Sequence, residues 1–435
     1  MSARETALNV LIACRKDGAW SNGVLKGYCA HDGLDRREAA LAARLCYGVL
    51  QNRARLDYYL RQLLTGRIKD LHPAVHDILL LGMYQIYEMD KIPVSAAVNE
   101  SVALAKIYCR KQKNASALVN GVLRNAVRTK GTLEQPQKLC DLYSHPQKLI
   151  DMFRAYVGED RLEPMLAANN TVAPTVIQVN TKMITTEALA ELLKAEGVNV
   201  EAHGWLPDCL ILRDTGNLEQ LESFQKGCFY VQDAAARLSV LCAGIFKGAH
   251  VLDCCAAPGG KSFAAAMDGA GSIVSCDIHT HKLGLIQKGA QRLGIPEIQV
   301  LQQDASVFQD CWENKNDVVL ADVPCSGYGI IRKKPDIRYK DPDTMQQLPQ
   351  LQLEILTNQA RYVKPGGVLL YSTCTLVRKE NEGVVEKFLK NNSEFYTEPL
   401  QLPNVFPKNQ TGMLSLIPGE YDTDGFFICR LRRAL

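Results

Sequence analysis

Apolar residues in the first 128 positions recur at steps of three and four, which is the period of an amphipathic helix. Breaks at 16–23 and 31–33, and at Pro73 and Pro93, separate the periodic stretches. Five helices are therefore expected, at 4–14, 36–64, 74–89, 94–109 and 115–128. Three short polar residues are placed to begin helices, namely Asp35, Ser95 and Ser116. Together these features predict an all-α bundle over residues 1–130.

The pattern changes after this bundle. A polar connector with one helix, "HPQKLIDMFRAYVG", precedes four short runs with strand character. The runs are "PTVIQVN", "VNVEAHG", "CLILRD" and "CFYVQD", with helical segments after the first and the third. Their order, strand-helix-strand-strand-helix-strand, is typical of a ferredoxin-like unit. Residues 131–235 are thus predicted to form a linker and a small α+β subdomain of the RRM-like type.

Residues 236–435 alternate between apolar runs and helical patterns. The expected strands are "HVLDCC", "SIVSCD", "IQVLQQD", "DVVLAD", "VLLYST" and "GFFICRL". Such alternation predicts a doubly wound, mostly parallel α/β sheet of the Rossmann-like type. Ligands bind at the carboxyl ends of the strands in such sheets, so polar residues there are the candidates for function.

Charge is spread unevenly along the chain, although the net charge is only +3. Residues 1–130 hold 20 Lys and Arg against 11 Asp and Glu, and residues 101–130 hold seven basic residues and no acid. An excess of positive charge at one end predicts a polyanionic partner, usually a nucleic acid. A merely solvated basic surface remains the alternative.

Composition narrows the class of protein further. The chain is 47% hydrophobic and 22% charged, as in globular proteins, and has no apolar run long enough for a membrane helix. The N-terminus has no signal-peptide pattern, so a cytoplasmic protein is expected. The 15 cysteines include no Cys-x-x-Cys pair. We interpret them as reduced thiols and expect no metal site.

The stretch "DCCAAPGGKS" at 253–262 ends the first strand of the α/β region. It lacks the Gly-x-Gly-x-x-Gly fingerprint of dinucleotide binding, and Cys255 replaces the first glycine of a P-loop. S-adenosylmethionine fits better, because three strands in succession end in an acid. Asp277 is placed for the ribose hydroxyls, Asp304 for the adenine amino group, and Asp322 faces the reaction.

Two cysteines follow strand ends, Cys325 in "ADVPCSG" and Cys374 in "YSTC". Methylation of carbon 5 of a pyrimidine needs a thiolate, which adds to carbon 6 and makes carbon 5 nucleophilic. Basic residues at 378 and 379 favour a thiolate at Cys374. Neighbouring strands would bring the two thiols to opposite sides of one flipped-out base. Spacing alone does not decide which thiol attacks.

These motifs, with "IRKKPDIR" and "ENE", resemble those of RNA cytosine-5 methyltransferases. "IPVSAAVNESVALAK" and "LVNGVLRNAVR" resemble the NusB-type RNA-binding domain. Over nearly the whole chain the sequence is similar to the RsmB (Sun, Fmu) family. That resemblance implies methylation of a cytosine in 16S rRNA with S-adenosylmethionine as the cofactor. We expect the protein to act as a monomer.

The resemblance also implies roles for single residues. Cys374 would be the nucleophile and Cys325 would assist release of the adduct, while Lys261 and Asp322 would touch the cytosine. The residues implied to line the cofactor are Cys255, Ala256, Ala257, Pro258, Gly259, Gly260 and Lys261, with Asp277, Asp304 and Asp322. Tyr328 departs from the pattern, which has a small residue there.

Three alternatives stay open. The same chemistry could act on tRNA, since the catalytic motifs do not specify the RNA. A non-catalytic NusB-like RNA-binding factor would fit the basic helical region, but the intact motifs speak against it. An amino-methyltransferase would carry an Asp/Asn-Pro-Pro-aromatic motif where this chain has "DVPC".

Overall fold

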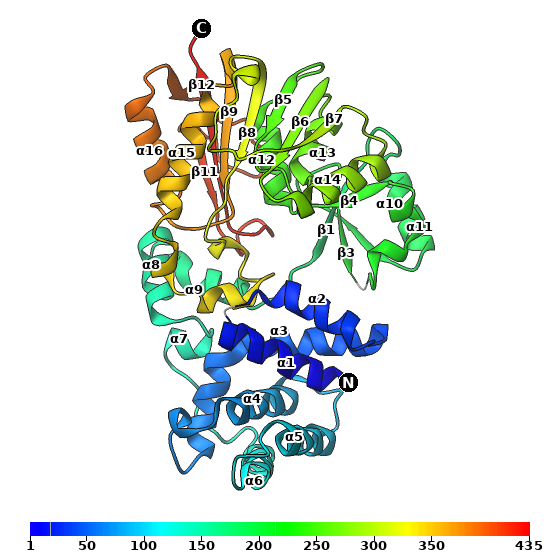
Figure 1. Cartoon of the computed structure of the whole chain (residues 1–435), viewed down its shortest axis with the longest axis vertical. Coiled ribbons are helices and arrows are strands. Elements are labelled where there is room, and N and C mark those ends of the chain that lie inside the picture. The colour runs from blue at the N-terminus through cyan, green and yellow to red at the C-terminus, as the bar shows by residue number, and fades with distance from the viewer. Residues whose placement is uncertain (18, 214) are drawn as a thin grey trace. The chain divides into compact units, whose positions relative to one another are not determined.

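The computed structural model describes residues 1–17, 19–213 and 215–435. Gly18 of the expected break at 16–23 and Asp214 of the expected strand "CLILRD" lie outside the described residues. The chain forms two compact units (Figure 1). One contains residues 1–171 together with 331–341, and the other contains 172–330 and 342–435.

The first unit is helical, and all five helices expected from the periodicity are confirmed. It also contains α2, which the periodicity missed because glycines interrupt its sequence, SNGVLKGYCAH. The helices are α1 Ala3–Asp17, α2 Ser21–His31, α3 Arg36–Leu63, α4 Pro73–Glu88, α5 Val94–Tyr108, α6 Ala115–Arg128, α7 Leu139–Leu142, α8 Gln147–Val157 and α9 Glu159–Ala168, with short turns η1 Ile68–Asp70 and η5 Pro335–Tyr339. Helix α4 is buried over most of its circumference, which makes it the centre of the bundle.

One of the three expected helix starts is confirmed and two are wrong. The Asp35 side chain accepts a hydrogen bond from the backbone N–H of Glu38 at 2.8 Å, as an N-cap should. Helix α5 instead begins at Val94 with Pro93 as its N-cap, two residues before Ser95, and α6 has Asn114 as its N-cap, two residues before Ser116. Proline's fixed φ and the left-handed φ of 62° at Asn114 end the preceding turn before either serine is reached.

Residues 331–341 fold with the helical unit although the sequence groups them with the α/β region. Arg338 is only 1% exposed, and its guanidinium donates to the carbonyls of Gln51 at 3.0 Å and Ser144 at 3.1 Å. The Ser21 hydroxyl donates to Asp336 at 2.5 Å. Buried polar groups need such partners, so these contacts fix the segment in place.

The second unit contains a four-stranded antiparallel sheet in the order β2-β3-β1-β4. Its strands are β1 Thr175–Val179, β2 Asn199–Ala202, β3 Cys209–Arg213 and β4 Phe229–Val231, connected through α10 Thr186–Ala195, η2 Leu218–Gln220 and α11 Glu222–Gln225. A third strand lying between the first and the second is the split-βαβ arrangement. The ferredoxin-like prediction is confirmed.

The same unit contains an eight-stranded sheet whose main path is β10-β12-β9-β8-β5-β6-β7, with β11 paired to β12. Its strands are β5 His250–Asp253, β6 Ser272–Asp277, β7 Ile298–Gln302, β8 Asn316–Asp322, β9 Val363–Thr373, β10 Phe395–Thr397, β11 Met413–Leu416 and β12 Phe426–Arg433. The five strands β5–β9 run parallel, whereas β10, β11 and β12 pair antiparallel. The mostly parallel sheet is confirmed, and β10 and β11 are additions that their short sequences did not reveal.

Helices cover both faces of this sheet (Figure 1). The helices are α12 Ala234–Ala243, α13 Gly260–Met267, α14 Thr280–Leu293, α15 Leu348–Ala360 and α16 Glu382–Asn391. Val318 and Leu320 of β8 pack in the core with α12–α14, while Val319 and Ala321 pack with α15 and α16. Successive strand residues point to opposite faces, so the middle of β8, residues 318–321, is apolar because both faces are buried there.

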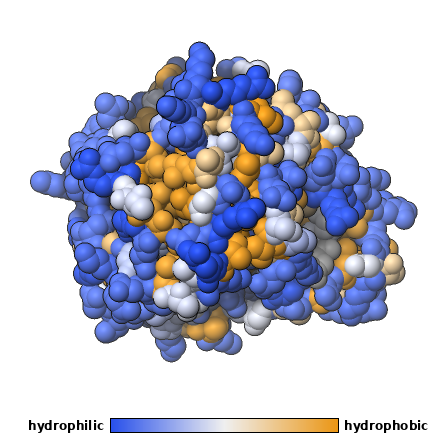
Figure 2. All heavy atoms as spheres, turned by 90° about the horizontal axis from the view of Figure 1, so that it is seen from below, coloured by the Kyte–Doolittle hydropathy of each residue, from blue (hydrophilic) through white to orange (hydrophobic). Residues whose placement is uncertain are grey.

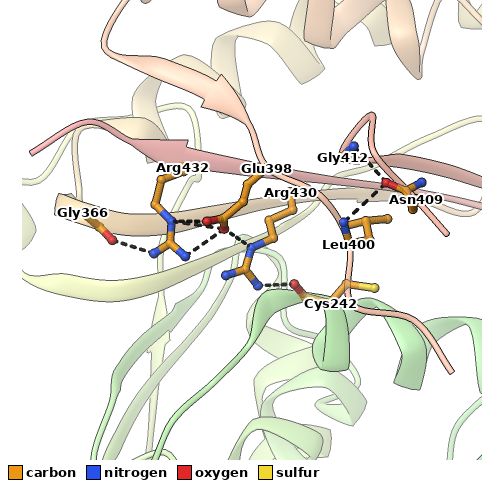
Figure 3. A network of polar contacts seen from close by, with 8 residues as sticks. All are labelled: Cys242, Gly366, Glu398, Leu400, Asn409, Gly412, Arg430 and Arg432. Atoms are coloured by element: carbon orange, nitrogen blue, oxygen red, sulfur yellow. Dashed lines mark hydrogen bonds and ion pairs between the residues drawn. The ribbon is translucent and has the colours of Figure 1, made fainter.

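An ion-pair network connects the last strand of the sheet to neighbouring segments (Figure 3). Glu398, just after β10, receives hydrogen bonds from Arg430 at 2.5 Å and Arg432 at 2.8 Å, both on β12. The same two guanidinium groups also donate to the carbonyls of Cys242 on α12 and Gly366 on β9. One carboxylate with its two arginines thus connects four segments of the fold.

Helices α5 and α6 leave part of their apolar surface open. Ile107 and Leu118 are 47% and 40% exposed. Figure 2 shows hydrophobic side chains gathered among hydrophilic ones on one face of the molecule.

Within the described part of the chain, no helix has the length and apolar character that crossing a bilayer requires.

Candidate active site

The candidate site lies at the point in the large sheet where the order of the strands reverses. From β5 the chain proceeds through β6 and β7 on one side, and β8 and β9 follow on the other. The loops after β5 and β8 therefore diverge at the carboxyl edge, which leaves a crevice in sheets of this kind. Every site residue predicted from the sequence lies in the second unit.

The loop after β5 brings backbone close to this crevice. The N–H of Ala256 donates to the carbonyl of Cys276 at 2.7 Å, and that of Gly259 donates to Ala256 at 2.7 Å. Gly259 has a φ of +111°, which other residues rarely adopt, and an added Cβ would lie 2.4 Å from the Phe263 ring. Glycine is required here, and Gly260 then begins α13.

Asp277 and Asp304 each use one carboxylate oxygen locally. Asp277 Oδ1 accepts the N–H of His279 at 2.9 Å, and Asp304 Oδ1 accepts the N–H of Ser306 at 2.9 Å. Among the described residues, no hydrogen bond to the second oxygen of either acid is seen. Both carboxylates are therefore held in place with one oxygen available to a ligand.

Lys261 and Asp322 form an ion pair between α13 and the end of β8. Lys261 Nζ lies 2.6 Å from Asp322 Oδ2, and the Ser372 hydroxyl donates to Asp322 Oδ1 at 2.8 Å. Burial opposes the charge of Lys261, but Asp322 and, more weakly, Asp253 and Cys374 raise the pKa of its ammonium. Lys261 is thus a fixed cation close enough to Cys374 for their charges to interact.

Asp253 at the end of β5 was not singled out from the sequence. It is fully buried and accepts the Ser262 hydroxyl at 2.7 Å, which in turn accepts the Ser275 hydroxyl at 2.7 Å. Burial raises the pKa of Asp253 to about 7, against the opposing effects of the Ser262 hydrogen bond and the Lys261 charge. This chain of hydroxyls fixes α13 to β5 and β6 beneath the glycine loop. An acid preceding "CCAAPGGKS" was the available signal.

The two candidate thiols lie side by side. Cys374 directly follows β9 and Cys325 follows β8 by three residues, and their sulfur atoms are 3.3 Å apart. A planar base between two sulfurs needs about 3.5 Å on each side, roughly 7 Å in total. In this arrangement a base can approach the pair but cannot lie between the thiols.

The surroundings distinguish the two thiols electrostatically. The hydrogen bond to Cys374 raises the pKa of Cys325 well above its ordinary value, and burial and the negative charges of Cys374, Glu380 and Asp322 act in the same direction. Cys325 therefore keeps its proton near neutral pH. The Lys261 ammonium interacts with Cys374 on the other side of the pair.

Backbone contacts fix the two thiol loops to each other. The N–H of Gly329 donates to the carbonyl of Cys374 at 2.9 Å, and the N–H of Gly425 donates to Gly329 at 2.8 Å. A Cβ at Gly329 would lie 1.9 Å from the Gly425 oxygen. Only glycine permits this approach. Tyr328, where a small residue was expected, is buried in the turn Tyr328–Ile330.

Arg378, which the sequence placed near Cys374, is engaged elsewhere. Its guanidinium lies 2.8 Å from Glu386 of α16 in an exposed ion pair. A cation that does interact with Cys374 is Lys261, which lies 113 residues earlier in the chain.

Comparison with known proteins gives matches over three regions of the chain. Residues 245–432 match the family described as 16S rRNA methyltransferase RsmB/F. Residues 1–128 match the NusB family, and residues 145–219 match the RsmF/B-like ferredoxin-like domain. The NusB match corresponds to the helical bundle, the ferredoxin-like match to the small sheet and the methyltransferase match to the large sheet.

Whole-length relatives agree with this. The chain is 36% identical to the probable ribosomal RNA small subunit methyltransferase B of Bacillus subtilis (strain 168), over 99% of each protein. It is 33% identical to ribosomal RNA small subunit methyltransferase B of Vibrio cholerae, over 91% of this chain and 90% of that protein. The crystal structure of PH0851 superposes with a TM-score of 0.81 at 24% identity, covering 100% of this chain and 99% of the other, and shows the same fold.

Proposed function

The chain belongs to the 16S rRNA methyltransferase RsmB/F family of S-adenosylmethionine-dependent enzymes, and from this premise we propose that it methylates carbon 5 of a cytosine in 16S rRNA. The observation that carries the proposal is the pair of thiols, 3.3 Å apart beside Lys261 and Asp322. Methyl transfer to a nitrogen or oxygen atom needs no such thiols. Transfer to carbon 5 of a pyrimidine needs a nucleophile at carbon 6.

Cys374 takes the role of nucleophile and Cys325 that of the thiol that assists release. The Cys374 thiolate adds to carbon 6 of the base, and carbon 5 gains electron density and accepts the methyl group. A base then takes the proton from carbon 5, and the electrons of the broken C–H bond restore the double bond and expel the Cys374 sulfur as a thiolate. The raised pKa of Cys325 supports this division, because the thiol that keeps its proton is not the first nucleophile.

Lys261 and Asp322 lie where the pyrimidine ring would be held. The Lys261 ammonium stabilises negative charge on Cys374 and on the ring as the sulfur adds. Asp322 keeps Lys261 in position through the 2.6 Å ion pair. Asp322 is itself fixed by Ser372, which precedes Cys374 by two residues.

The loop after β5 fits S-adenosylmethionine. When bound, this cofactor supplies the methyl group on a sulfonium centre. The loop turns at Gly259 into the start of α13 at Gly260, and the remaining oxygens of Asp277 and Asp304 suit ribose hydroxyls and an adenine amino group. The adjoining loop residues Cys255, Ala256, Ala257 and Pro258 complete this lining.

The helical unit is the proposed RNA-binding part. The basic residues near the end of α5 and on α6 are all exposed, and among the described residues none of them has an acidic partner; they are Lys106, Arg110, Lys111, Lys113, Arg124, Arg128 and Lys130. Cations without acidic partners, beside exposed apolar side chains such as Leu118, suit phosphates and unstacked bases. The names of the relatives support small-subunit rRNA over tRNA.

Transfer of labelled methyl from S-adenosylmethionine to protein-free 16S rRNA, followed by nucleoside analysis, tests the proposal. The expected result is label in 5-methylcytidine from rRNA and none from tRNA assayed in parallel. Label only in tRNA would overturn the substrate and keep the chemistry. Label in a base methylated on nitrogen would overturn the chemistry.

A further inference from the structure

Glu380 is a buried carboxylate that contacts the Cys325 loop. It follows Cys374 by six residues and is only 3% exposed. Its Oε2 atom accepts the N–H of Ser326 at 2.9 Å and the side-chain amide of Gln352 at 2.9 Å. A buried carboxylate is costly unless its oxygens are paired, so these donors hold Glu380 in one position.

Gln352, on α15, binds the Cys325 loop at a second point. Its amide also donates to the carbonyl of Pro324 at 2.9 Å. The peptide groups on both sides of Cys325 are therefore bound, one through Pro324 and the other through Ser326. The Ser326 hydroxyl further contacts the Thr375 hydroxyl at 2.7 Å, which links the residues that directly follow the two cysteines.

Building on the proposed function, we propose that Glu380 is a positioning residue for Cys325. It holds the loop so that the Cys325 thiol lies against the Cys374 sulfur, where release of the covalent adduct requires it. It also places a negative charge beside Cys325, which keeps the proton on this thiol and leaves Cys374 as the nucleophile. Glu380 touches neither the base nor the cofactor in this role.

Replacement of Glu380 by glutamine tests the proposal, because it keeps the size and removes the charge. With 16S rRNA as substrate, Glu380→Gln is expected to lower kcat roughly 10- to 100-fold, as small misplacements of reacting groups do. A covalent protein–RNA complex is expected to accumulate on a denaturing gel, since addition continues and release slows. The matched control is Glu386→Gln on α16, an exposed carboxylate paired with Arg378, and it should behave as the unmodified protein.

A second readout separates positioning from a general loss of structure. The titratable groups that interact with Cys325 include Cys374, Glu380, Asp322 and the phenol of Tyr371 on β9. Loss of the Glu380 charge should therefore shift alkylation of Cys325 by iodoacetamide, followed by peptide mass spectrometry, to lower pH. Binding of S-adenosylmethionine, measured by calorimetry, should stay within about twofold, because Glu380 does not contact the loop after β5.

The outcomes distinguish this inference from the proposed function. Normal turnover of Glu380→Gln without a covalent complex overturns the inference, whereas formation of 5-methylcytidine by Cys374→Ala overturns the proposed function itself. If Glu380→Gln does not bind S-adenosylmethionine, the variant Gln352→Met tests the inference in its place. That variant removes the amide that bridges Glu380 and Pro324, and it should also accumulate the complex; normal turnover would contradict the inference.

Discussion

At the scale of single residues, two thiols 3.3 Å apart cannot both be thiolates without strong repulsion. The charged groups around the two sulfur atoms differ. Glu380 and Asp322 act on Cys325, and the Lys261 ammonium acts on Cys374. Lys261 lies 113 residues before Cys374 and Glu380 lies 55 residues after Cys325, whereas Asp322 precedes Cys325 by only three residues.

Replacement of Cys374 by alanine is expected to abolish methyl transfer, because no sulfur remains to add to carbon 6. The loss should exceed about 10³-fold, as for other covalent nucleophiles. Single-turnover assays with labelled S-adenosylmethionine measure it, and Cys311→Ala, which removes an exposed cysteine, is the control. Residual turnover near the normal rate would assign the nucleophile to Cys325.

Replacement of Cys325 by alanine is expected to have a different effect. Addition through Cys374 continues, but release is impaired, so protein should remain bound to RNA through a covalent bond. A denaturing gel with labelled RNA detects the complex. Normal turnover with no shifted band would contradict the role given to Cys325.

At the scale of elements, the sheet depends on contacts that its hydrophobic pattern does not contain. Strand β12 is held to the segment after β10 through Glu398 (Figure 3). The hydrogen bonds from Arg432 and Arg430 and the positive charges of both arginines lower the pKa of Glu398 against the effect of burial. Stabilisation from this carboxylate is therefore complete above its unfolded-state pKa and decreases as the pH falls through that value to the lower folded-state pKa.

Glu398→Gln is accordingly expected to lower the free energy of unfolding by roughly 1–3 kcal/mol at neutral pH. The difference from the unmodified protein should shrink in acid, where Glu398 becomes protonated. Urea unfolding at several pH values measures both effects. Glu386→Gln, in an exposed ion pair, should change stability by less than about 1 kcal/mol. A difference that persists unchanged in acid would argue against an ionic origin.

At the scale of the whole molecule, the exposed basic residues of α5 and α6 and the two thiols belong to different compact units. Affinity for RNA should therefore be separable from chemistry. Phosphate contacts contribute salt-dependent binding with little sequence information, whereas the reacting groups determine turnover.

The combined substitution of Arg110, Lys111 and Lys113 by alanine tests this division. It should weaken binding of 16S rRNA and reduce the salt slope by about 0.7–0.9 for each phosphate that is no longer neutralised. kcat at saturating RNA should stay within about twofold. Arg67→Ala, at an exposed arginine already paired with Asp70, is the control. An unchanged salt slope would place the RNA on another surface.

The order of apolar positions determined most of the architecture by itself. Helical and two-residue periods are local properties, so they predicted five of the first six helices and the four strands of the small sheet. They also predicted strands β5 to β9 and β12 of the large sheet. The same sequence carried the glycine loop, the acids at strand ends and both cysteines as motifs. The glycine-rich α2, the short α7, β10 and β11, and α9 with its internal Pro164 were missed, because their local signals are weak and tertiary packing decides them.

Only the tertiary structure decided how these parts meet. The assignment of residues 331–341 to the helical unit depends on partners such as Gln51 and Ser144, which no local pattern indicates. The sequence placed Arg378 beside Cys374, yet folding puts Lys261 there and pairs Arg378 with an exposed acid. Electrostatic interactions depend on distance and burial in space, and neither can be obtained from separation along the chain.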